Sequence, residues 1–140
     1  MWIYKDKEVS DEDIQGYVAF VYLITNLQSG KKYIGKKLLT KTRTKKIKGK
    51  TRKKKVVTES DWRDYYGSND TLKRDVVELG AENFRREILD LCKSRGTANY
   101  LEARYQFESR VLESNDYYND QIRVRVHRSH LKLDFKSESK

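Results

Sequence analysis

Two tyrosines, Tyr22 and Tyr33, stand eleven residues apart in two short apolar segments of this chain. A phenol can orient an attacking water, take a proton when its pKa is lowered, or bind a phosphate oxygen. If the two segments pair as neighbouring strands, both phenols can lie on one face and act together. The plainer alternative is that the two tyrosines pack their rings together, as most strand tyrosines do.

The segments that must position these tyrosines follow a simple order along the chain. Two stretches rich in Tyr, Val, Ile and Phe flank a polar five-residue connection, which predicts a β-hairpin. Spacing and stop signals predict strands over 17–25, 31–37, 84–92 and 117–128, and helices from Ser60 to Gly67, 70–79 and 97–113. We therefore expect an α+β fold, with a small three-stranded antiparallel sheet that the hairpin opens and helices flank.

The net charge of +10 is concentrated in one third of the chain. Between Ile14 and Thr58 there are 14 Lys or Arg and no Asp or Glu, whereas the rest holds 17 basic and 21 acidic residues. This asymmetry favours a polyanionic partner, most simply the phosphates of a nucleic acid. The densest part, 41–57, lacks the apolar face of a membrane-surface helix, and like-charge repulsion predicts a flexible basic loop there.

These features lie within an ordered set of motifs that resembles the GIY-YIG endonuclease family, in particular its phage-type, homing- or restriction-like stand-alone members. The second motif is present as Tyr33-Ile34-Gly35, and Phe20-Val21-Tyr22 stands at the first, where the tyrosine is kept. Residues 62–68 (WRDYYGS), 80–84 (GAENF), Glu102 and Tyr118-Asn119 follow in the family's order. The resemblance covers residues 17–119 and implies a metal-dependent endonuclease that hydrolyses DNA phosphodiesters.

The resemblance also implies roles for single residues. Tyr22 is expected to help activate water, Tyr33 to position the phosphate, and Glu102 to hold one Mg²⁺ or Mn²⁺ at the scissile phosphate. Without the family, Glu102 reads as a solvated acid near a helix N-terminus. We expect double-stranded DNA to be bound by Lys37, Arg43, Lys45, Lys46, Lys48, Arg52, Lys53, Tyr66 and Asn119.

The chain departs from the family at the catalytic arginine, which usually stands four residues before a His or Tyr on the first helix. Asp61 and Trp62 occupy those positions here. Lys36, Arg43 and Arg63 are left as candidates for the positive charge that stabilises the reacting phosphate. The departure keeps a second function open, a non-catalytic nucleic-acid-binding module on a degenerate nuclease scaffold. A domain whose basic segment binds an acidic protein is a third.

Length and composition bound the remaining expectations. A chain of 140 residues suits one domain, here with a lead-in over 1–13 and a disordered tail over 129–140. The single Cys92, the acidic N-terminus and the absence of a long apolar run predict a cytoplasmic protein with no membrane partner. His127 and His130 have no further zinc ligands at suitable spacing. The sequence leaves a homodimer for double-strand cleavage open.

Overall fold

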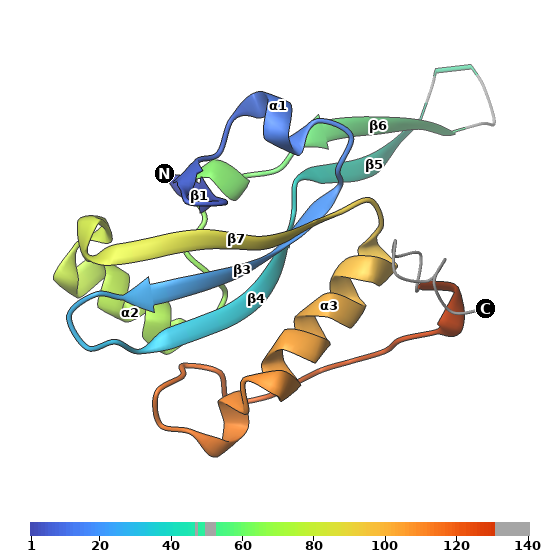
Figure 1. Ribbon diagram of the computed structural model, residues 1–140. Coiled ribbons are helices and arrows are strands. Elements are labelled where there is room, and N and C mark those ends of the chain that lie inside the picture. The colour runs from blue at the N-terminus through green and yellow to red at the C-terminus, as the bar shows by residue number, and fades with distance from the viewer. Residues whose placement is uncertain (47, 50–52, 131–140) are drawn as a thin grey trace.

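The computed structural model describes residues 1–46, 48–49 and 53–130, and of Lys45 and Lys53 it describes the backbone alone. Figure 1 shows a main sheet with helix α3 (Arg95–Glu108) along one face and a separate pair of strands that extends away from it. Within the described part of the chain, no helix is long and apolar enough to cross a membrane.

The main sheet has five strands in the order β2-β1-β7-β3-β4. Their bounds are β1 Trp2–Tyr4, β2 Lys7–Glu8, β3 Ala19–Asn26, β4 Lys32–Leu38 and β7 Phe84–Cys92. The expected antiparallel trio is present as β7-β3-β4, and the α+β class is confirmed. The expectation of only three strands is wrong, because β1 pairs in parallel with β7 and β2 pairs antiparallel with β1.

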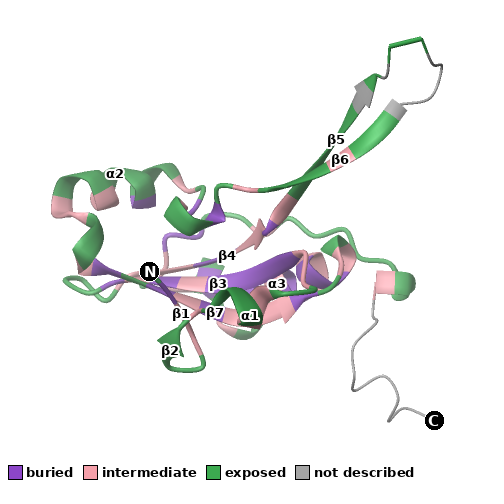
Figure 2. Cartoon of the chain, turned by 90° about the horizontal axis from the view of Figure 1, so that it is seen from above, coloured by how far each residue is buried: buried purple, intermediate pink, exposed green. Residues whose placement is uncertain are grey.

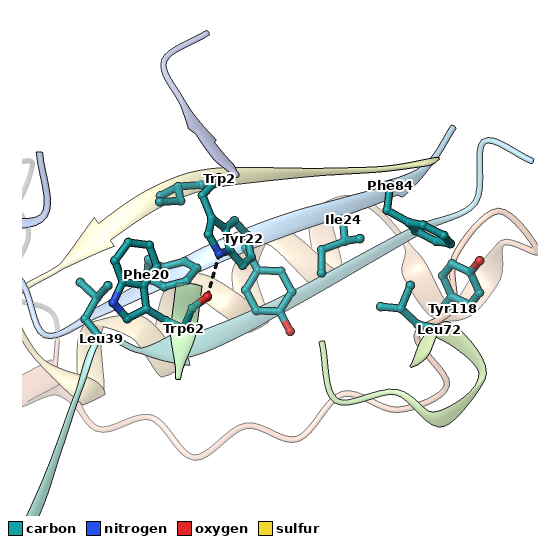
Figure 3. Close-up of a cluster of buried hydrophobic side chains, with 10 residues drawn as sticks. Trp2, Phe20, Tyr22, Ile24, Leu39, Trp62, Leu72, Phe84 and Tyr118 are labelled. Atoms are coloured by element: carbon teal, nitrogen blue, oxygen red, sulfur yellow. Dashed lines mark hydrogen bonds between the residues drawn. The ribbon is translucent and has the colours of Figure 1, made fainter. Parts of the chain in front are cut away.

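Strand β3 lies at the centre of the core because side chains cover both faces of the sheet. On one face its residues pack in the cluster of Figure 3, which includes Trp2, Phe20, Tyr22, Ile24, Trp62 and Leu72. On the other face Ala19 and Val21 pack with Ala98 and Leu101 of α3. The indole of Trp2 also donates a hydrogen bond to the Trp62 carbonyl at 2.8 Å. Trp2 thus anchors the lead-in to the core, since burying one such side chain contributes about 1.5–3 kcal/mol.

The helices begin at residues that satisfy their free N–H groups. Asn69 caps α2 (Asp70–Leu79), and Ser94 caps α3, which begins at Arg95, two residues before the expected start at 97. A short helix, α1 (Asp11–Ile14), has a capping box with Ser10. The helix expected from Ser60 is a single 3₁₀ turn at Trp62–Asp64, and further 3₁₀ turns lie at Ala81–Asn83, Val111–Glu113 and Arg128–His130. Helix α3 ends at Glu108, earlier than the expected end at residue 113.

The basic segment is not the flexible loop that its charge suggests. Strands β5 (Thr40–Lys46) and β6 (Lys53–Glu59) form a separate antiparallel pair, here called the ribbon, which projects from the body in Figures 1 and 2. Thr alternates with the cations along most of β5, and β6 continues after its lysines with Val56, Val57 and Thr58. These β-branched residues favour a pleated backbone. Repulsion between lysines thus opposes pairing without preventing it.

The C-terminal segment also differs from expectation. No strand is described over 117–128; Tyr117 forms only an isolated bridge with Lys32. The alternating Val124 and Val126 remain 49% and 38% exposed, so the pattern has no sheet edge to bury it. The predicted disordered tail lies mostly outside the described residues, which end at His130.

Candidate active site

Tyr22 and Tyr33 lie on the same face of the β3–β4 hairpin. Tyr22 pairs directly with Gly35, and Tyr33 is two residues before Gly35, so the two rings are diagonal neighbours with centroids 6.1 Å apart. A Cβ atom at Gly35 would lie 2.7 Å from Tyr22 Cζ and 3.0 Å from Tyr33 Cε2. Because real Cβ atoms do not approach this closely, the missing side chain of Gly35 is what gives the two phenols their room.

The Tyr22 hydroxyl is buried and unpaired. The side chain is 0% exposed, and among the described residues its oxygen has no hydrogen-bond partner. Figure 3 shows the hydroxyl pointing out of the apolar cluster. Burial raises the pKa of Tyr22 well above its ordinary value, and the nearby phenols of Tyr65 and Tyr33 raise it further. This direction favours a neutral phenol at Tyr22 and opposes the lowered pKa considered for a tyrosine base.

The second phenol, Tyr33, is half-buried and has a partner. Its hydroxyl lies 3.1 Å from Ser68 Oγ, and burial raises its pKa. The carboxylates of Glu102 and Asp120 add to this rise, which places both within electrostatic reach of Tyr33. Asp120 was missed by the sequence reasoning, although it directly follows the Tyr118-Asn119 motif.

Tyr65 forms one wall of the site and was also missed. Its ring meets Tyr22 edge-on with centroids 5.8 Å apart, and the Lys37 ammonium lies 4.2 Å from its centroid. The buried guanidinium of Arg86 donates to the carbonyls of Arg63 and Tyr65 at 3.0 and 2.9 Å. Arg86 thus fixes the loop that carries Tyr65, and the neighbouring tyrosines of the WRDYYGS motif were the available signal.

Glu102 approaches the same region from helix α3. Its side chain is 17% exposed, and one carboxylate oxygen lies 4.0 Å from Lys36 Nζ. Burial raises the pKa of Glu102, and the ammonium and backbone N–H of Lys36 partly offset the rise. Glu102 also adds to the raised pKa of Tyr22, so the carboxylate and the buried phenol act on each other. The structure thus pairs Lys36 with Glu102, and Glu102 lies close enough to Tyr22 and Tyr33 to raise the pKa of both phenols.

Strand β4 is an edge strand of the sheet, so side chains from its two faces can approach the same edge. Gly35 faces the tyrosines, whereas Lys36 pairs with Val21, whose side chain packs on the α3 side. Asn119 holds this edge: its amide accepts from Ile34 N–H at 3.1 Å and donates to Ile34 C=O at 2.8 Å. Since Asn119 is only 8% exposed, its position suits alignment of β4 better than contact with DNA.

The other predicted catalytic and DNA-binding residues lie in different parts of the structure. Arg63 is exposed, and its guanidinium pairs with Asp11 at 2.7 Å and Glu59 at 3.1 Å. Tyr66 stacks on Arg86, 4.1 Å from ring centroid to guanidinium. Arg43, Lys46 and Lys48 are exposed on or near the ribbon. Arg52 and the side chains of Lys45 and Lys53 lie outside what the structure describes.

A basic groove of about 500 Å³ leads from this cluster to the root of the ribbon. Its lining offers four cations, and its one carboxylate is paired with a lysine at 2.6 Å. The lining residues are Lys36, Lys37, Leu38, Lys41, Ser60, Asp61, Arg95 and Asn99. Such a surface suits a chain of phosphates.

The side chains at this site could hold a metal ion only if few of its ligands come from the protein. Among the described residues, no group of three or more His, Cys, Asp or Glu side chains is placed to hold a metal. Mg²⁺ nevertheless binds through one or two carboxylates plus water and substrate phosphates. Glu102, largely buried and close enough to Tyr22 and Tyr33 to raise their pKa values, meets that requirement.

A basic α+β domain with these groups at one sheet edge has the make-up of a protein that acts on phosphodiesters. The family model described as "Putative endonuclease segE, GIY-YIG domain" matches residues 2–122. The chain therefore belongs to the GIY-YIG endonuclease family. Membership implies nuclease activity with DNA as substrate, and nucleases of this family generally depend on a divalent metal. No curated protein and no solved structure matches the chain.

Proposed function

We propose that this protein is a metal-dependent DNA endonuclease whose active site comprises Tyr22, Tyr33, Lys36 and Glu102. The observation that supports it most is the Tyr22 hydroxyl, which is buried and has no hydrogen-bond partner among the described residues, while the Glu102 carboxylate is close enough to raise its pKa further. A buried polar atom without a partner is rare in native proteins and calls for an external one. A water or a phosphate oxygen is the partner that the family's reaction supplies.

In the reaction, a water oxygen bonds to phosphorus, the bond from phosphorus to one ester oxygen breaks, and that oxygen leaves with a proton. Because burial favours the neutral phenol, the Tyr22 hydroxyl would orient the attacking water; that water would lose its proton to surrounding water, from which the leaving ester oxygen takes one. Tyr33, aligned by Ser68, hydrogen-bonds the phosphate. Glu102 would hold Mg²⁺ or Mn²⁺, which when bound supplies Lewis-acid activation of the phosphoryl oxygen.

Lys36 is the cation best placed to stabilise the charge that builds on the phosphate. It lies 4.0 Å from Glu102 and lines the basic groove, whereas Arg63 is engaged by Asp11 and Glu59. A positioned positive charge in such a site stabilises the transition state more than the ground state. Lys37 and Lys41 in the same groove would bind flanking phosphates.

One observation favours the non-catalytic alternative. An arginine at the family's usual place is absent, and Lys36 beside Glu102 makes an ion pair that could serve a DNA-binding surface alone. Both functions predict salt-sensitive binding to duplex DNA, so a binding measurement does not distinguish them. A cleavage measurement does distinguish them.

The test is cleavage of supercoiled plasmid with Mg²⁺, with Mn²⁺ and with EDTA. We expect the wild type to nick or linearise plasmid only with metal, and Glu102→Gln to bind DNA without cutting it. Glu108→Gln is the matched control, because Glu108 lies on the same helix, exposed and paired with Arg104 at 2.8 Å. Metal-independent cutting, or equal cutting by Glu102→Gln, would contradict the proposed site. Tight binding without any cutting would favour the non-catalytic module.

A further inference from the structure

The ribbon is fixed to the body at its root. Strand β4 ends at Leu38 and β5 begins at Thr40, and the residue between them, Leu39, is only 3% exposed. Its backbone N–H donates to Val18, and its carbonyl accepts from Ser60 at 2.9 Å. The Ser60 hydroxyl also donates to Leu38 C=O at 2.5 Å. The direction of the ribbon relative to Lys36 and Glu102 is therefore set by the core.

The dimensions of the ribbon match a groove of duplex DNA. Seven residues pair in register on each strand, from Thr40 with Glu59 to Lys46 with Lys53. At about 3.4 Å per residue the ribbon is about 24 Å long. The major groove, about 12 Å wide, admits a two-stranded β-ribbon. Such a length follows roughly seven base pairs at about 3.4 Å of rise each.

The cations of the ribbon are concentrated toward its outer end. In backbone register Lys45 lies opposite Lys54 and Lys46 opposite Lys53, and this density of positive charge opposes pairing. A two-stranded sheet on its own is also marginally stable. Of the carboxylates at the root, Glu59 is engaged by Arg63 and Asp61 by Lys37. Phosphates on both sides of a groove would relieve this repulsion.

One face of the ribbon continues the lining of the basic groove. Lys41 lines the basic groove together with Lys36, next to Glu102. Arg43 is two residues further along the same strand, so its side chain lies on the same face. It is exposed, pairs across the strands with the short side chain of Val56, and has no ion-pair partner among the described residues. An unpaired arginine in this position is free to contact a base edge.

We propose that the ribbon enters the major groove beside the cleavage site and that Arg43 contacts a guanine there. The inference rests on the proposed function in taking duplex DNA as the substrate. Arginine pairs with the N7 and O6 atoms of guanine, the commonest base-specific contact in that groove. Lys54 and Lys55, opposite Lys45 and Thr44, would contact phosphates and add affinity without sequence information.

The experiment selects binding sites from a random-sequence duplex pool with Glu102→Gln, which removes cleavage from the measurement. We expect enrichment of sequences with a fixed guanine, and loss of binding when dimethyl sulfate methylates N7 of that guanine. In Arg43→Ala the preference for this guanine should fall roughly 10- to 100-fold. Lys55→Ala should weaken binding to all sequences alike, and the slope of log K against log salt concentration should become shallower by about one. Arg74→Ala and Lys73→Ala are matched controls, because both residues are exposed on helix α2, which lies away from the ribbon.

The outcomes separate this inference from the proposed activity. If the wild type never cuts DNA but enrichment and N7 interference are seen, the ribbon's role would be supported and the proposed endonuclease activity would be contradicted. Metal-dependent cutting without enrichment, or an unchanged preference in Arg43→Ala, would overturn the inference alone. Competition by the minor-groove ligand netropsin, without N7 interference, would also overturn it. Thermal melts of each variant check that the fold is kept.

Discussion

Gly35 stands directly opposite Tyr22 in the β3–β4 ladder, and the space of its missing side chain is filled by the Tyr22 ring. The glycine of the YIG motif therefore has a packing reason that lies on the neighbouring strand. The relation ties the two halves of the sequence motif together, because each phenol can keep its position only while position 35 lacks a Cβ atom.

Gly35→Ala is expected to destabilise the protein by about 1–3 kcal/mol, since the added methyl overpacks a site with no free volume. It should also lower cleavage by displacing both phenols. Urea unfolding and plasmid cleavage measure the two effects. In a Tyr22→Phe background the stability loss should shrink, because the nearest atom to the new methyl is the Tyr22 hydroxyl oxygen. An equal loss in both backgrounds would contradict this packing relation.

Tyr22→Phe is expected to raise stability while it lowers cleavage. The substitution removes a buried hydroxyl without a partner, a change worth about 1 kcal/mol in favour of the folded state. Cleavage should fall about 100-fold or more. Tyr105→Phe is the control of opposite sign, because the Tyr105 hydroxyl donates to the Asp90 carboxylate and its loss should destabilise. A destabilised Tyr22→Phe would mean that its hydroxyl has a stabilising partner.

Glu102→Gln is expected to change how stability depends on pH. Burial raises the folded-state pKa of Glu102, so the folded protein binds this proton more tightly than the unfolded chain. Stability from this group is present at low pH and falls as pH rises from the unfolded to the folded pKa. Glutamine stays neutral, so the variant should be more stable than wild type above that window. Urea unfolding across the carboxyl range and at neutral pH measures this, with Glu108→Gln as control.

Lys36→Ala and Arg63→Ala are expected to differ in cleavage. Lys36 lies beside Glu102 and lines the basic groove, so its removal should slow cutting about 100-fold while the fold is kept. Arg63 is exposed and pairs with Asp11 and Glu59, and exposed ion pairs contribute little, so its removal should leave cleavage nearly unchanged. Single-turnover cleavage rates compare the two. The reverse ranking would identify Arg63 as the catalytic cation.

Cys92 is expected to be inert in the folded protein. Burial raises the pKa of its thiol to about 12, and the Asp90 carboxylate adds to this, so almost no thiolate exists near neutral pH. A chromogenic disulfide reagent should react quickly in denaturant and only at the rate of opening in buffer. Fast reaction with the native protein would show that strand β7 is less protected than its burial indicates.

Much of the site could be predicted because its signals are local. The hairpin of Tyr22 and Tyr33 follows from two β-rich stretches around a polar turn, and family motifs identify the positions of Gly35 and Glu102. The family and the α+β class are confirmed by the comparison and the fold. The roles of the four central residues stay predictions until variants are measured.

Other features depended on partners far away in the chain. Trp2 lies in the core only because β1 pairs in parallel with β7, more than eighty residues later. The raised pKa of Tyr22 comes from burial, which its neighbours in sequence do not reveal. Arg63 was one of three candidate cations, and only the structure shows that its guanidinium pairs with Asp11 and Glu59.

The sequence by itself determined the basic character, the hairpin, the order of the motifs and the family, because these depend on residue type and short spacing. Only the tertiary structure decided that the basic segment is a ribbon, that Lys36 is the cation beside Glu102, and that the Tyr22 hydroxyl is left unpaired. The physical reason is that pairing of charged strands, ion-pair choice and burial are set by contacts between distant residues, whose energies no local pattern contains.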